Sequence, residues 1–174
     1  MTEAQTTFDQ VLKGARNLGV LVITGRLWPP KAGALWIGDQ SLAELLAPHA
    51  LGNMVALGII AGGPGWAYVQ AGTRPLDAAQ ITQLRQLAAE AGGTVYLGRL
   101  QVLTPARWLV QRGLALADGD PQSTLEAARA SGWPADFDDD PVLFLDDQPI
   151  YHLLARENVG RNMTLVIGVL AADG

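Results

Sequence analysis

Residues 35–52, LWIGDQSLAELLAPHALG, align without a gap on residues 143–160, LFLDDQPIYHLLARENVG. The two segments lie 108 positions apart and are identical at Leu35/Leu143, Asp39/Asp147, Gln40/Gln148, Leu45/Leu153, Leu46/Leu154, Ala47/Ala155 and Gly52/Gly160. A unit that occurs twice predicts a body with an approximate two-fold axis and paired surfaces around it. No catalytic or cofactor motif accompanies the repeat.

The residues upstream of each segment also correspond, here after a shift of 73 positions. This shift aligns Phe8/Ile81, Val11/Leu84, Ala15/Ala88, Gly19/Gly92, Val22/Val95, Gly25/Gly98, Arg26/Arg99 and Leu27/Leu100. We therefore expect two diverged helix–strand–strand–helix–strand repeats, residues 1–72 and 73–174, that share one core. The alternative is chance similarity, since helix–strand units commonly share leucine-rich helices, capping aspartates and terminal glycines.

The second copy is longer, because the shift grows from 73 to 108 between the two matched regions. The additional residues, at about 101–140, predict a helical insertion with helices at 105–116 and 121–130. An acidic loop, residues 136–140, follows them. This insertion is the main expected difference between the copies.

Periodicity and turn residues predict the remaining elements. Expected helices cover residues 8–17, 39–50 and 75–91, and expected strands cover residues 20–24, 34–37, 54–61, 66–71, 95–97 and 164–170. Consecutive prolines predict a loop at residues 25–30. The glycine-rich turn at 62–65 predicts a hairpin between the strands on either side of it, which ends the first repeat.

Composition indicates a compact α/β or α+β protein, with 49% hydrophobic and 17% charged residues. The net charge of −5 disfavours a nucleic-acid partner, which needs a basic surface. We expect no membrane segment, because glycine and proline interrupt the longest uncharged stretch. The absence of cysteine fits a cytoplasmic location and excludes thiolate metal sites; we expect no metal or cofactor.

Arg26 and Arg99 occupy equivalent positions, each after a short apolar strand and a glycine. Across a pseudo-two-fold axis, the two guanidinium groups could face a shared cleft and hold a phosphate or a carboxylate. The alternative is that each arginine pairs with a nearby carboxylate or packs on an aromatic ring such as Trp28.

Asp39 and Asp147 recur between a strand and a helix, where α/β proteins often place ligands. Their alternative role is to cap the helix that follows. Trp28 and Trp133 lie beside prolines in expected loops, where aromatic side chains suit a protein interface. Both tryptophans could instead fold back onto the sheet.

These features favour a non-enzymatic binding or regulatory module whose partner is a protein or a small anionic ligand. The alternative is a small hydrolase or transferase that uses the two aspartates with an arginine clamp. The sequence contains no recognisable nucleophile motif to support the enzyme.

Overall fold

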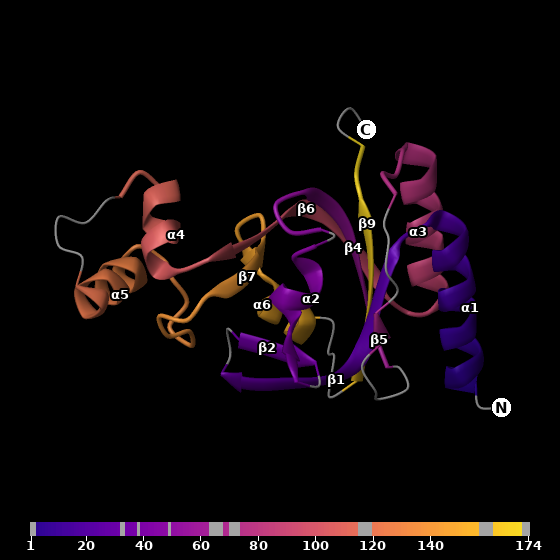
Figure 1. Ribbon diagram of the computed structural model, residues 1–174, viewed down its shortest axis with the longest axis horizontal. Helices are drawn as coiled ribbons and strands as arrows, with labels where there is room; N and C mark the ends of the chain where they lie inside the picture. Colours follow the sequence, from indigo (N-terminus) through magenta and orange to yellow (C-terminus); the bar gives the residue numbers. More distant parts are fainter. Residues whose placement is uncertain are drawn as a thin grey trace.

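The computed structural model describes residues 3–31, 34–37, 39–48, 50–62, 68–69, 74–114, 120–156 and 162–171. It is a mixed α/β body with a mostly antiparallel sheet and six helices in these ranges (Figure 1). The helices are α1 (Glu3–Leu18), α2 (Leu42–Leu46), α3 (Ala78–Glu90), α4 (Pro105–Gln111), α5 (Pro121–Ala130) and α6 (Ile150–Arg156). The strands are β1 (Leu21–Lys31), β2 (Ala34–Ile37), β3 (Gln40–Ser41), β4 (Met54–Ala61), β5 (Tyr68–Val69), β6 (Thr94–Leu103), β7 (Val142–Leu145), β8 (Gln148–Pro149) and β9 (Asn162–Val169).

The strand order is β3-β2-β1-β9-β4-β6-β7-β8, with β5 paired to β1 outside this path. β9 lies beside β1, and β4 lies beside β6. Strand β9 of the second half therefore pairs with the first strand of the first half, and β4 of the first half pairs with the first strand of the second half. The two halves form one interlocked sheet.

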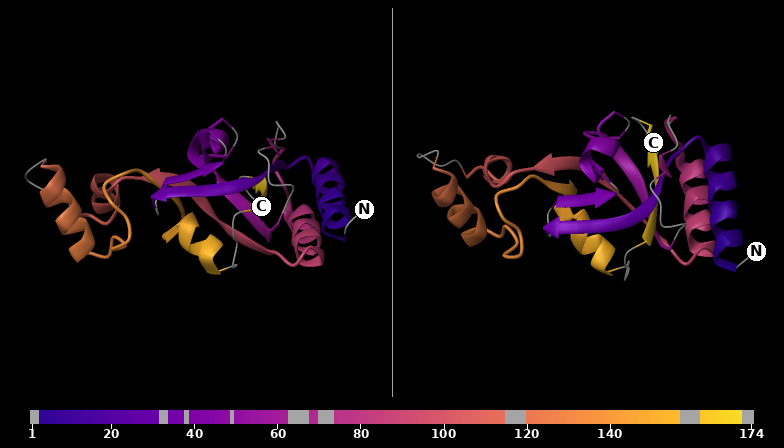
Figure 2. Two further views of the ribbon diagram at one scale, coloured as in Figure 1. Left: turned by 90° about the horizontal axis from the view of Figure 1, so that it is seen from below. Right: turned by 60° about the horizontal axis from the view of Figure 1, so that its bottom comes forward.

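The central strands are buried on both faces. One face packs against α1 and α3, which lie side by side at one end of the molecule (Figure 2). The opposite face forms a core with α2 and α6, in which apolar residues of both halves meet, such as Leu57, Leu145 and Ile167. Alternation of side chains along each strand separates these two cores.

The strand pairings of the two halves follow the shifts of 73 and 108 that align the sequence. Arg26 pairs with Asn162, and their counterparts Arg99 and Met54 pair with each other. The same correspondence relates Leu27↔Ile37 to Leu100↔Leu145, and Trp36↔Ser41 to Phe144↔Pro149. Gly19 and Gly92, which are also counterparts, both end helices with positive φ, at 73° and 77°.

The insertion forms a lobe at the other end of the molecule, where β6 leads into α4 and α5 (Figure 1). Its own core is aromatic and contains Trp108, Trp133, Phe137 and Phe144. Thr104 caps α4 and Asp120 caps α5, and a proline follows each cap in the first turn. The predicted helix at 121–130 is confirmed, whereas α4 ends at Gln111, earlier than expected.

Several elements of the structure differ from those that the sequence predicts. The hairpin after β4 is wrong, because β5 pairs with β1 and the neighbours of β4 are β6 and β9. The expected loop at 25–30 is strand, since β1 continues through both prolines to Lys31, with a register shift between Trp28 and Lys31. A bulge accommodates prolines because they cannot donate to a strand ladder. The strand at 95–97 likewise extends to Leu103 as β6.

Candidate binding cleft

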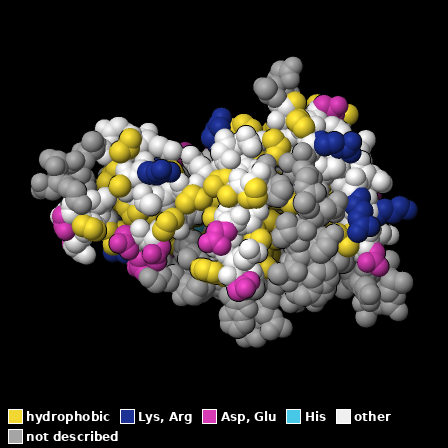
Figure 3. All heavy atoms as spheres, in the orientation of Figure 1, with side chains coloured by type: hydrophobic (Ala, Val, Ile, Leu, Met, Phe, Trp, Pro, Cys, Tyr) yellow, Lys and Arg dark blue, Asp and Glu magenta, His cyan; other side chains and the backbone are white. Residues whose placement is uncertain are grey.

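A cleft of about 630 Å³ opens between the C-terminal half of β6, α4 and the connection from α2 to β4. Its lining residues are Leu51, Gly52, Gln101, Val102, Leu103, Ala106, Arg107, Val110 and Gln111. In Figure 3, hydrophobic side chains extend on this face from the α4 lobe toward the middle of the molecule. The cleft thus lies where the insertion joins the part of the fold that both halves share.

The described lining of the cleft is mainly apolar, with polar groups at few positions. Gln111 Nε2 donates a hydrogen bond of 3.0 Å to Gln101 Oε1 and ties α4 to β6. Arg107 is the one formally charged residue in this lining. An apolar surface with a single cation suits a ligand that is mainly apolar and carries a negative charge.

The strand β6 changes neighbours at the cleft. Up to Leu100 it is bonded on the β4 side, where Leu100 N donates to Asn53 O at 3.0 Å and Leu100 O accepts from Gly52 N at 2.6 Å. Backbone groups of successive residues point to alternate sides of a strand, so those of Val102 point to the same side as those of Leu100. Among the described residues, no strand pairs with β6 on this side beyond Leu100. The N–H and C=O of Val102 therefore form an open strand edge in the cleft.

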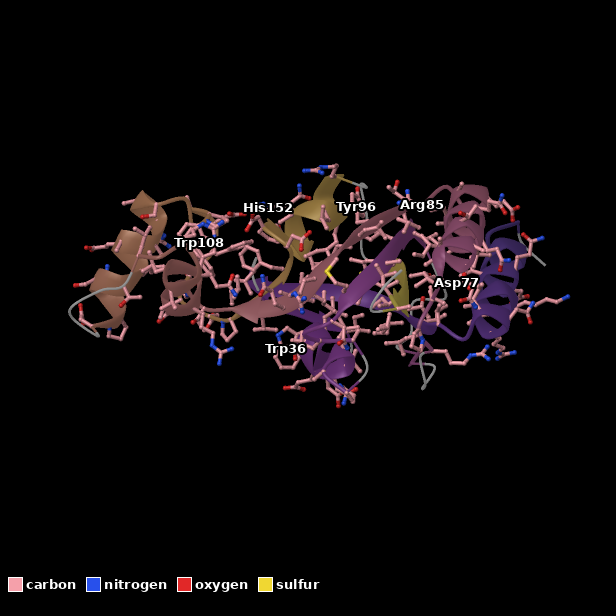
Figure 4. The ribbon with its side chains drawn as sticks, turned by 90° about the horizontal axis from the view of Figure 1, so that it is seen from above. Trp36, Asp77, Arg85, Tyr96, Trp108 and His152 are labelled. Atoms are coloured by element: carbon pink, nitrogen blue, oxygen red, sulfur yellow. The ribbon has the colours of Figure 1, made fainter. Side chains whose placement is uncertain are left out.

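The buried face of α4 holds the helix in place. Trp108, labelled in Figure 4, is 3% exposed. Its ring packs edge-to-face on that of Trp133. The guanidinium of Arg112 lies 3.8 Å from the Trp108 ring centroid and 3.4 Å from a carboxylate oxygen of Asp147. With this face anchored, α4 presents Val110, 67% exposed, beside the cleft.

The structure does not bring Arg26 and Arg99 together. Arg26 pairs with Asn162 at the start of β9, whereas Arg99 pairs with Met54, whose carbonyl accepts from Leu170 N beyond the end of β9. Asn162 and Leu170 lie eight residues apart in sequence, which corresponds to about 26 Å along a strand. This separation of the two backbone positions gives no support to a small anion shared by the two arginines. Arg99 Nη1 donates instead to Gly52 O at 2.6 Å, and the Arg26 side chain lies outside the described residues.

The duplicated aspartates lie in hairpin turns, not at the helix caps. Asp39 precedes Gln40 in the β2–β3 turn, and the cap of α2 is Ser41, whose Oγ accepts from Glu44 N. Asp147 lies in the two-residue turn between β7 and β8, after Asp146, whose φ is 53°. Asp146, not Asp147, is the residue with positive φ in this turn, a conformation that tight hairpin turns often need. Neither Asp39 nor Asp147 lines the cleft.

The structure describes the side chain of Trp133 but not that of Trp28. Trp133 is 2% exposed, packs on Phe144 at 5.8 Å between ring centroids, and donates from Nε1 to Asp138 O at 3.1 Å. Its ring folds back onto the sheet and offers no surface to a partner. Trp28 belongs to β1 and pairs with Trp36, but its side chain lies outside the described residues.

The cleft residues are absent from the sequence-based candidates. The one local signal is the run Trp108-Leu109-Val110, three consecutive apolar residues on a short helix. A helix with a single buried face leaves one of three consecutive side chains exposed. Here Trp108 and Leu109 are buried and Val110 is exposed.

Comparison with protein-family models, with curated proteins and with solved structures gives no match to this chain. Among the described helices, none has the length and apolar character needed to cross a membrane.

Proposed function

We propose that this protein is a non-enzymatic binding module and that the cleft between β6 and α4 receives a segment of a protein partner. The observation that carries the proposal is the cleft itself, an open, mainly apolar surface in which Arg107 is the one charged residue of the described lining. Its volume of about 630 Å³ is within the range of ligand-binding clefts.

The fixed position of α4 supports this proposal. Three separate contacts anchor the helix: the buried Trp108, the stacked Arg112 and the Gln101–Gln111 hydrogen bond. A preformed surface loses less conformational entropy on binding than a surface that must order itself. The exposure of Val110 then represents apolar area that a partner could bury.

The other functions considered have less support. The strand register separates the backbones of Arg26 and Arg99 and gives no support to a shared anion, so the proposal keeps the protein partner alone. A hydrolase or transferase would need Asp39 and Asp147 in a common site with an arginine. Both aspartates belong to hairpin turns, and Asp147 pairs with Arg112.

Selection from a displayed library of random 15-residue peptides, with the purified full chain as the target, tests the proposal. Val110→Glu places a carboxylate in the apolar cleft and should weaken selected peptides at least about tenfold, the effect of 1.4 kcal/mol. The matched control is Leu114→Glu, because Leu114 is also exposed, at 45%, and follows α4 outside the cleft lining. Failure to select any peptide that Val110→Glu weakens would refute the proposed function.

We also infer that the fold arose by duplication of a single unit. The two sequence shifts relate the pairings of the first half to those of the second: β1–β9 to β6–β4, β1–β2 to β6–β7, and β2–β3 to β7–β8. The described residue pairs agree with these shifts, apart from the register shift near Lys31. Gly58 and Val166 are themselves 108 positions apart and pair directly at the centre of β4 and β9. An axis through this pair would exchange the two halves.

Division of the chain between residues 72 and 73 tests the interlocked arrangement. The first fragment lacks β9, which lies between its strands β1 and β4, and the second fragment lacks β4, which lies between its strands β6 and β9. Neither fragment should therefore show cooperative unfolding. Mixed in equal amounts, they should assemble into a complex with the circular dichroism of the intact chain. Independent folding of either fragment would contradict the interlocked core.

A further inference from the structure

The open edge of β6 has a counterpart in the first half that differs in one respect. The position 73 residues before Val102 is Pro29, which lies in β1 where that strand has passed its last pairing with β9 at Arg26. Proline has no N–H, and proline on an exposed edge is a common protection against unwanted strand pairing. The first half therefore lacks the edge donor that Val102 retains.

Val102 also lies in the cleft, whose lining includes the apolar residues Leu51 and Leu103. Among the described residues, no hydrogen bond from its N–H or to its C=O is present. A backbone donor and acceptor on one open edge suit an extended peptide, which can bond to both groups.

From these observations, and resting on the proposed function, we infer that the partner segment is an extended peptide that adds a short strand beside Val102 and places an acidic side chain at Arg107. Alternate side chains of an added strand point to one face, so apolar side chains of the peptide enter the cleft at every second position. The charge follows from the described lining, which contains Arg107 and no acidic residue.

Val102→Pro tests the role of the edge, because it removes the N–H and reproduces the residue found at the counterpart position. Peptides selected on the wild-type chain should bind this variant at least about tenfold more weakly, as expected when a buried peptide carbonyl loses its donor. Val102→Thr is the matched control, since it keeps the N–H and nearly the same shape; its affinity should stay within about threefold, less than 0.7 kcal/mol. Thermal unfolding of both variants establishes that they fold.

A scan of the peptide itself gives an independent measurement that needs no variant of the protein. Methylation of single backbone nitrogens in a selected peptide should weaken binding at alternate positions only, because alternate N–H groups face the edge. Replacement of the peptide's acidic residue by its amide should weaken binding to the wild-type chain and have little effect on the Arg107→Gln variant. Such non-additivity identifies the pair in contact.

The outcomes separate this inference from the proposed function. If Val102→Pro binds as tightly as wild type and methylation shows no alternation, while Val110→Glu abolishes binding, the added strand is refuted and the cleft remains. If no cleft variant affects any selected peptide, both are refuted. If the protein alone sediments as a dimer that Val102→Pro converts to a monomer, the occupant is a second copy of this chain, and a separate peptide partner is refuted.

Discussion

Replacement of Trp133 by alanine should be among the most damaging single changes in the insertion lobe. The ring is 2% exposed and contacts Trp108, Phe137 and Phe144 at centroid distances of 5.8 to 6.2 Å. Removal of a buried tryptophan typically costs about 3–5 kcal/mol, partly through the cavity that remains. The hydrogen bond from Nε1 to Asp138 O is lost as well and contributes about 1 kcal/mol. We expect the free energy of unfolding to fall by about 4 kcal/mol.

Urea denaturation followed by far-ultraviolet circular dichroism measures this loss. For a chain of 174 residues, 4 kcal/mol corresponds to a decrease in Tm of about 8–16 °C. Trp133→Phe, which keeps most of the apolar contact and loses the donor, should cost about 1–2 kcal/mol. Val110→Ala, at an exposed position, should change stability by less than about 0.5 kcal/mol. A loss below about 1 kcal/mol for Trp133→Ala would refute the buried position of the ring and restore it as an interface candidate.

Two further changes test the helix caps. Asp77→Ala should lower the free energy of unfolding by about 1 kcal/mol, because Asp77 and Gln80 form a reciprocal capping box at α3. Urea denaturation measures this loss, and an unchanged midpoint would argue against the capping box. The pKa of Asp120 is lowered by hydrogen bonds from the backbone and then the side chain of Ser123, so its carboxylate stabilises the fold above the ordinary pKa of 3.8, and this contribution disappears as the pH falls through the lowered value. Urea midpoints should therefore show that Asp120→Asn loses less stability than wild type as the pH falls from about 5 to below 3.8. An identical pH dependence of the two proteins would contradict this assignment.

Local sequence patterns predict the helices of this protein better than its strand pairing. The helix at 121–130 and the strand at 34–37 coincide with α5 and β2, because capping residues, prolines and apolar periodicity mark their ends. The pairing of β5 with β1 could not be predicted locally, since the glycine-rich sequence at 62–65 predicts only a change of direction and not the partner of the next strand. Strand pairing depends on residues distant in sequence, which short patterns do not contain.

The candidate site shows the same limit. The equivalence of Arg26 and Arg99 is visible in the sequence, but the sheet register places them at opposite ends of the central strands. Both recurring aspartates lie in the tight turn of a β hairpin and do not come together in one site. The edge at Val102 exists because β6 outlasts its pairing with β4, and only the register of those two strands reveals that.

The most direct test of the account is amide hydrogen exchange at Val102, measured by NMR with and without a selected peptide. In the free protein, the Val102 N–H should exchange rapidly, whereas the Leu100 N–H, which donates to Asn53 O, should exchange slowly. Saturation with peptide should slow exchange at Val102 and leave Leu100 nearly unchanged. If the Val102 amide is already protected in the free protein, or stays unprotected when the peptide is bound, the proposed strand edge is contradicted.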